Sequence, residues 1–179
     1  MRGGAVLLAL LIGGPIYAGP SDSGRLPPCD APDVDPWVTE LRDGVLSFDL
    51  LAKYAVELYG SPITCEGSVT TEFDGTKFGL LRLGFTGGAR FQVETLPPEM
   101  SVATLRNPAG FADEDAARRV LEAHCDTVGV EIDWSAPRTT TDGDERIETY
   151  SDPDEGMNAS ASLVFREDTL VALRFSLAL

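Results

Sequence analysis

The stretch FGLLRLGFTGGARFQVETL, residues 78–96, decides the fold of this chain. On each side of the paired glycines, Gly87 and Gly88, apolar and polar residues alternate with a period of two. That period places successive side chains on opposite faces of a strand, and Gly-Gly between two such runs favours a hairpin. The residues on the expected buried face are Leu81, Leu83, Phe85, Phe91, Val93 and Thr95. The stretch therefore predicts two antiparallel strands with one buried face and one wet face.

Further strands are expected on both sides of this hairpin. Residues 68–73 alternate in the same way and end at a turn signal, Asp74-Gly75. After Pro97-Pro98, residues 102–105 predict a short fourth strand. The central part of the chain is thus expected to form an antiparallel meander.

Two helices are expected before the meander. Asp35 followed by Pro36 is typical of an N-cap and the first helical position, and Gly44 can end that helix. Ser47 is the candidate N-cap of a second helix that stops at Gly60. Its apolar stripe, at helical spacing, consists of Leu50, Leu51, Tyr54, Ala55 and Leu58.

The same plan repeats after residues 107–110. Acidic residues at 113–115 favour the start of a helix that carries His124 on its apolar stripe. Strands are then expected at 130–134, 147–150, 159–165 and 170–177. The predicted fold class is α+β, with helices packed on one face of antiparallel meander sheet. Two tandem units, 35–107 and 108–179, and a single sheet with helices on one face both agree with this pattern.

The helix over 47–59, its Gly60-Ser61-Pro62 stop and the strands FGLLRLGF and ARFQVETL resemble the unit of beta-lactamase-inhibitor-protein-like domains. Small outer-membrane-assembly lipoproteins share that unit. The resemblance covers most of residues 35–179 and implies tandem helix-plus-meander units in an exported protein that binds another protein. It carries over no interface residue.

The first 18 residues have the parts of a secretion signal. Arg2 supplies the positive charge, residues 5–12 form an apolar run, and a small-residue cleavage site ends at Ala18. Residues 19–34 are rich in Gly, Pro and Ser and predict a flexible leader. We therefore expect an exported protein, periplasmic or extracellular, and the remaining sequence predicts no membrane span.

The formal net charge is −15 at pH 7. This charge argues against binding to nucleic acid or to anionic membranes, because their affinity comes from Lys and Arg that neutralise phosphates. It permits a basic protein partner, cation binding, or high solubility alone.

Three cysteines, Cys29, Cys65 and Cys125, allow three single pairings. Cys29 lies in the leader, whereas the other two fall in expected helices or strands, so we expect a Cys65–Cys125 disulfide or no disulfide. His124 beside Cys125 is not a catalytic pair, because adjacent helical side chains point about 100° apart. No other pattern predicts a catalytic residue or a cofactor.

The most acidic segment runs from 142 to 155. Asp152, Asp154 and Glu155 are candidate ligands for a weak calcium site, since hard cations prefer several oxygens around a turn. The glycine spacing does not match a helix-loop-helix calcium motif, and a solvated hairpin loop explains the same residues.

Trp134 and Tyr150 are the candidate partner-binding residues, because Trp and Tyr are frequent interface hot spots. Core or rim aromatics closing the sheet would have the same pattern. The sequence thus favours a non-enzymatic protein acting on an unidentified protein partner through an open sheet face or edge strands. The alternatives are a secreted hydrolase using paired carboxylates and a calcium-dependent envelope module.

Overall fold

The computed structural model describes residues 34–72, 74–96, 100–153 and 158–178. They form one antiparallel sheet of eight strands and three α-helices. The helices are α2 (Pro36–Phe48), α3 (Leu50–Tyr59) and α4 (Glu114–Thr127), with a short 3₁₀ turn η2 (Thr86–Gly88). The first four strands are β1 (Thr64–Thr71), β2 (Lys77–Gly84), β3 (Arg90–Leu96) and β4 (Met100–Arg106). The last four are β5 (Arg138–Asp142), β6 (Glu145–Ser151), β7 (Ser160–Arg166) and β8 (Thr169–Ala178).

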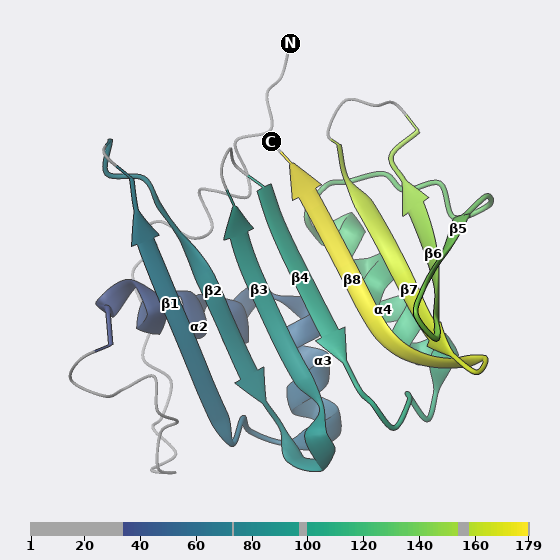
Figure 1. The fold of residues 1–179 in the computed structure, drawn as a ribbon, viewed down its shortest axis with the longest axis horizontal. Coiled ribbons are helices and arrows are strands. Elements are labelled where there is room, and N and C mark those ends of the chain that lie inside the picture. Colours follow the sequence, from purple (N-terminus) through teal and green to yellow (C-terminus); the bar gives the residue numbers. More distant parts are fainter. Residues whose placement is uncertain (1–33, 73, 97–99, 154–157, 179) are drawn as a thin grey trace.

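The strand order is β1-β2-β3-β4-β8-β7-β6-β5, so the two halves of the chain meet where β4 pairs with β8. All three helices lie on the same face of the sheet (Figure 1). α2 contacts β1 and β2, α3 contacts β3 and β4, and α4 contacts β7 and β8. The prediction of an α+β fold with helices on one face is therefore confirmed.

The core lies between the helices and the sheet. The register places Leu83, Phe91, Leu105, Leu173 and Leu163 side by side across five strands, and all five side chains are buried. This row exists because the strands alternate with period two, as the sequence predicted for residues 78–96. The next position along each strand points to the opposite, helix-free face.

The helix boundaries differ from those expected. α2 continues through Gly44 to Phe48, and Asp49 rather than Ser47 is the N-cap of α3. Asp49 Oδ1 accepts hydrogen bonds from the amides of Leu51 (2.8 Å) and Ala52 (3.0 Å). One carboxylate thereby satisfies two amides that have no partner within the helix, which explains why the helix begins there.

The prediction of a strand at 130–134 is wrong. These residues form no strand, although Val130 and Ile132 are buried, and Asp133 accepts hydrogen bonds from the amide and hydroxyl of Ser135. Such a local turn competes with strand pairing. The fifth strand instead starts at Arg138, in a fully exposed Thr-rich stretch whose β-branched residues favour a strand.

The other strands expected in the second half are present. β6 and β8 cover the residues expected at 147–150 and 170–177, and β7 covers those expected at 159–165 except Ala159. β7 and β8 are joined at Glu167 and Asp168, which both have positive φ, 48° and 66°. Two successive residues of this kind make the turn whose twist matches that of a hairpin.

Candidate functional site

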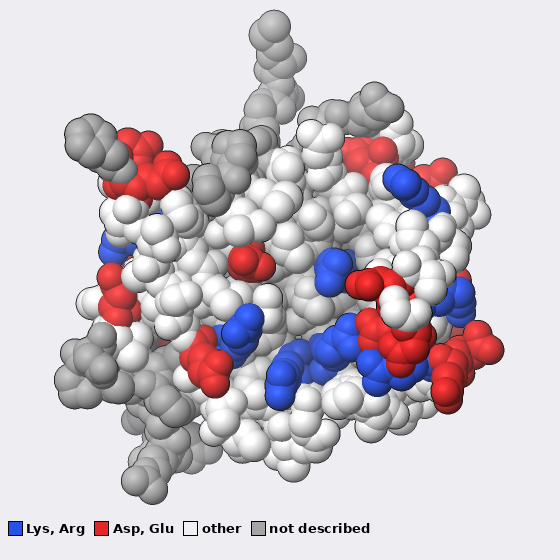
Figure 2. Space-filling view, viewed as in Figure 1, with Lys and Arg blue, Asp and Glu red and all other residues white. Residues whose placement is uncertain are grey.

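The open face of the sheet, opposite the helices, carries a group of four arginines. Arg82 lies on β2, Arg90 on β3, Arg106 on β4 and Arg174 on β8, and we call these four residues the arginine strip. Figure 2 shows blue side chains gathered across the middle of this face. Arg82, Arg90 and Arg174 are exposed, and Arg106 is about one-third exposed, with 36% of its side-chain surface accessible. The concentration is notable because the whole chain has a net charge of −15.

The register brings the arginine strip together. Arg90 lies directly opposite Arg106 in the β3–β4 pair, and Arg174 lies opposite Thr104 in the β4–β8 pair. Like charges directly across an antiparallel pair are destabilising. The Arg106 side chain has a carboxylate partner, described below, whereas no ion pair of Arg90 or Arg174 joins either residue to another described side chain. The open face therefore holds positive charge that its own side chains neutralise only in part.

Acidic and neutral polar groups border the strip. Arg82 Nε donates a hydrogen bond to Gln92 Oε1 (3.0 Å) on the neighbouring strand. Glu66 lies across from Arg82 in the β1–β2 pair, and Glu94 lies two residues beyond Gln92 on β3. The Gln92 hydrogen bond orients the Arg82 side chain, and the two glutamates place negative charge at this end of the open face.

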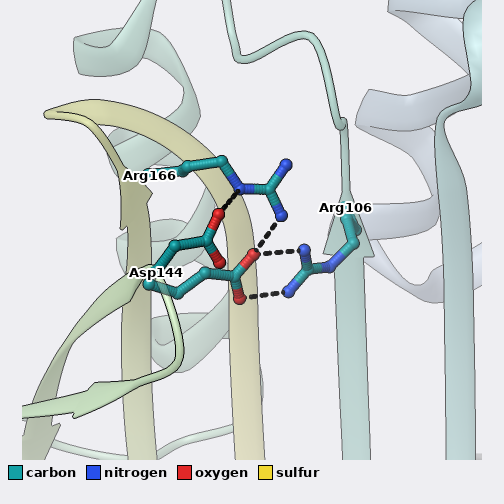
Figure 3. Close-up of polar contacts among 4 residues, drawn as sticks. Arg106, Asp144 and Arg166 are labelled. Carbon is teal, nitrogen blue, oxygen red and sulfur yellow. Dashed lines mark hydrogen bonds and ion pairs between the residues drawn. The ribbon is translucent and has the colours of Figure 1, made fainter.

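At the end of the strip nearest β6, one carboxylate joins two arginines (Figure 3). Glu145 accepts two hydrogen bonds from Arg106, both of 2.7 Å, and a third of 2.7 Å from Arg166 Nη2. Asp144 Oδ2 lies 3.0 Å from Arg166 Nε in an ion pair. We call Arg106, Asp144, Glu145 and Arg166 the ion cluster. The hydrogen bonds from Arg106, followed by those from Arg166, lower the pKa of Glu145 to about 2.

The ion cluster crosses two strands. β8 and β7 separate β4 from β6 in the sheet, which on a flat sheet would place the two strands about 14 Å apart. The long side chains of Arg106 and Glu145 bridge this distance across the open face. Val164, Val171 and Ala172 on β7 and β8 are buried in a small cluster separate from the main core. Ile147 packs against these three residues, and Ala172 lies directly opposite Arg106 in the β4–β8 pair, so the ion cluster lies beside this apolar cluster.

The aromatic residues expected at an interface lie elsewhere. Tyr150 is 3% exposed and faces the helices, in the same row as Ala161 and Phe175. Its ring centroid lies 5.0 Å from that of Trp134, which is partly buried. The Arg118 guanidinium lies 5.6 Å from the Trp134 centroid and 5.5 Å from the Tyr150 centroid. The structure thus brings Trp134 and Tyr150 together beside Arg118, and it leaves Tyr150 no surface for a partner.

The prediction of a disulfide between Cys65 and Cys125 is wrong. Cys65 is disulfide-bonded, whereas Cys125 is a free, buried thiol whose pKa burial raises to about 12. Cys65 lies on β1, four strands from the β8 strand that α4 covers, a separation of roughly 19 Å against the 7 Å limit for a disulfide. Cys29 lies outside the described residues.

The proposed calcium ligands are only partly described. Asp152 follows β6, and Asp154 and Glu155 lie outside the described residues. Within the described part of the chain, no three His, Cys, Asp or Glu side chains form a group that could hold a metal ion.

Paired catalytic carboxylates would require one carboxyl group with a raised pKa to act as an acid. Asp74, Asp133 and Glu145 have pKa values shifted the other way, because each accepts hydrogen bonds in its ionised form. These three groups therefore lack the property that acid catalysis needs.

No family model, curated protein or solved structure matches this chain. The resemblance to inhibitor-protein-like domains therefore stays a prediction. None of the helices among the described residues has the length and apolarity needed to cross a membrane. The secretion signal expected at 1–18 and the leader at 19–34 lie, except for Val34, outside the described residues.

Proposed function

We propose that this chain is an exported, non-enzymatic protein that binds another protein through the open face of its sheet. The observation that carries the proposal is the arginine strip, a positive group on the helix-free face of a strongly acidic chain. Arginine is enriched at protein interfaces, because its planar guanidinium pairs with carboxylates and is more weakly hydrated than an ammonium group.

The partner surface that fits is an acidic patch. Carboxylates placed opposite Arg90 and Arg174 would neutralise charge that the described side chains leave in place. At physiological salt the Debye length is about 8 Å, so the overall negative charge of the chain acts weakly over the distances between docked groups. A partner that is neutral or basic overall, with a local acidic patch, meets both conditions.

The proposed architecture is a pair of helix-plus-meander units, 35–107 and 108–179. The strand order supports it, because each half contributes four consecutive strands and the last strands of the two halves, β4 and β8, pair with each other. In this arrangement the arginine strip spans the junction, with three arginines from the first unit and Arg174 from the second. A partner would contact both units.

A capture experiment with matched variants tests this function. The tagged full chain, an Arg90→Glu/Arg174→Glu variant and a Lys53→Glu/Arg119→Glu variant would each be exposed to extracytoplasmic extract, and retained proteins identified by mass spectrometry. Lys53 and Arg119 are exposed on α3 and α4, so the second variant makes the same charge change on the helix side. We expect one stoichiometric partner on the wild-type chain and on the helix-side variant, and its loss from the variant with two substitutions in the arginine strip.

Retention of the same proteins by all three chains would contradict docking at the arginine strip. If the chain instead cleaves a protein that it retains, the result would favour a hydrolase. Export itself is tested by N-terminal sequencing of the chain recovered outside the cytoplasm, for which we expect Gly19 as the first residue.

A further inference from the structure

A pocket of about 110 Å³ opens on the helix side of the sheet, opposite the arginine strip. It lies between the last turn of α2, the last turn of α4 and strands β3, β4 and β8. α3 begins at its edge, because Asp49 both lines the pocket and caps that helix. Its apolar lining includes Leu41, Val45, Val93, Ala103 and Phe175.

The pocket contains one nearly buried polar side chain. His124 is 6% exposed, and its ring packs edge-on against Phe175 with the centroids 4.8 Å apart. No hydrogen bond joins its ring nitrogens to any other residue that the structure describes. Neither ring nitrogen belongs to the fully buried side-chain atoms that lack a partner, so the imidazole is reachable from the pocket and can hydrogen-bond to a group placed there.

The charge around His124 indicates which kind of group can bind there. Burial lowers the pKa of His124, and the nearby Asp49 carboxylate opposes this shift in part. At neutral pH the ring is then uncharged and offers one N–H donor and one nitrogen acceptor. An anionic ligand would meet the Asp49 carboxylate at the pocket lining, whereas a neutral hydroxyl group would not.

The volume limits the size of the ligand. A dry apolar cavity of about 150 Å³ holds a single aromatic ring. The pocket here is somewhat smaller but open to solvent, and Phe48, which is 61% exposed, stands at its lining. A single six-membered ring is therefore the size of group that the pocket can take up.

We propose that this pocket binds a small neutral molecule with one six-membered ring and one hydroxyl group, whose hydroxyl hydrogen-bonds to His124. The site is independent of the proposed function, because it lies on the other face of the sheet from the arginine strip.

Phenol is the test ligand and benzoate, a similar ring with a charged group, is the comparison. His124 is the only histidine in the chain, so its ring ¹⁵N signals in the full-length protein report the contact without ambiguity. We expect phenol to shift these signals and to bind at least about tenfold more tightly than benzoate. His124→Phe keeps a ring but loses the nitrogens, and we expect it to weaken phenol binding about fivefold, the usual size for one hydrogen bond.

Ser101→Leu places a larger apolar side chain in the pocket, and Ser68→Leu makes the same change on the exposed β1 strand. We expect the first variant to lose phenol binding and the second to keep it. The proposal fails if phenol leaves the His124 signals unmoved, if benzoate binds as tightly, or if the Ser101 variant binds phenol like the wild type. The wild-type shifts and the two serine variants decide the question even if His124→Phe does not fold.

Discussion

At the scale of single residues, Glu145 has the strongest electrostatic role in the described part of the chain. It accepts hydrogen bonds from both Arg106 and Arg166 and so joins β4, β6 and β7 on the open face. Charged hydrogen bonds of this geometry stabilise more than neutral ones, although the two arginines remain more than one-third exposed and solvent weakens the interaction.

The variant Glu145→Gln tests this role. We expect it to lower the free energy of unfolding by about 1–2 kcal/mol at pH 7, because Arg106 loses its carboxylate partner and Arg166 keeps only Asp144. The pKa of Glu145 falls from an ordinary 4.5 to about 2 in the folded chain. A lowered pKa means that this stabilisation is complete above about pH 4.5 and disappears as the pH falls toward 2. Urea unfolding at pH 7 and at pH 2.5 would measure both values.

Asp142→Asn is the matched control, since Asp142 is exposed at the end of β5 in the same hairpin and lies outside the ion cluster. We expect its effect to stay within about 0.5 kcal/mol at both pH values. An equal loss of stability in the two variants would mean that general charge, and not the ion cluster, stabilises the hairpin.

At the scale of helices and strands, Gly67 decides how closely α2 approaches the sheet. Gly67 lies on β1 and faces the helices, and a β-carbon at this position would collide with Val38 of α2. Val38 is 1% exposed, so it cannot turn away into solvent. The glycine therefore allows close helix–strand contact at one edge of the sheet.

Gly67→Ala should destabilise the chain by about 1–3 kcal/mol, because the added methyl group overpacks the interface. Val38→Ala removes the colliding atoms, and we expect the double variant to recover part of that loss. A double-mutant cycle from thermal unfolding measures this coupling. Additive effects of the two substitutions would show that Gly67 and Val38 do not limit the approach of α2.

At the scale of the whole molecule, the β4–β8 pair makes one sheet out of two halves. Leu105 and Leu173 face each other across that pair and are fully buried, so the core is continuous through the junction. A continuous core in a chain of this size favours unfolding in one step.

The chain's two tryptophans allow a direct test, because Trp37 lies on α2 in the first half and Trp134 lies before β5 in the second. Trp37→Phe leaves a fluorescence probe in the second half, and Trp134→Phe leaves one in the first. Within each variant, we expect the remaining tryptophan's fluorescence and far-ultraviolet circular dichroism to give the same unfolding midpoint. A fluorescence midpoint that differs from the circular dichroism midpoint of the same variant would show that the halves unfold separately.

Local periodicity predicted much of the architecture. The alternation in residues 78–96, the helical stripes and three strands of the second half, β6, β7 and β8, follow from spacing, because burial on one face imposes a period on the sequence. Boundaries depended on finer competition: Asp49 was a better cap than Ser47, and the turn at Asp133 prevented a strand. The Thr-rich stretch at 138–142 was a strand signal that the sequence interpretation missed.

The sequence by itself determined the fold class, the acidic charge, the helix-free wet face of the strands and the burial of His124. Only the tertiary structure decided the arginine strip, the ion cluster, the pocket beside His124 and the separation of Cys65 from Cys125. Each of these features joins residues from strands or helices far apart in the chain, such as Arg106 and Glu145. Periodicity reports which face of a strand or helix a residue occupies. It does not report which distant strand or helix lies beside that face, because strand order is set by packing of the whole sheet.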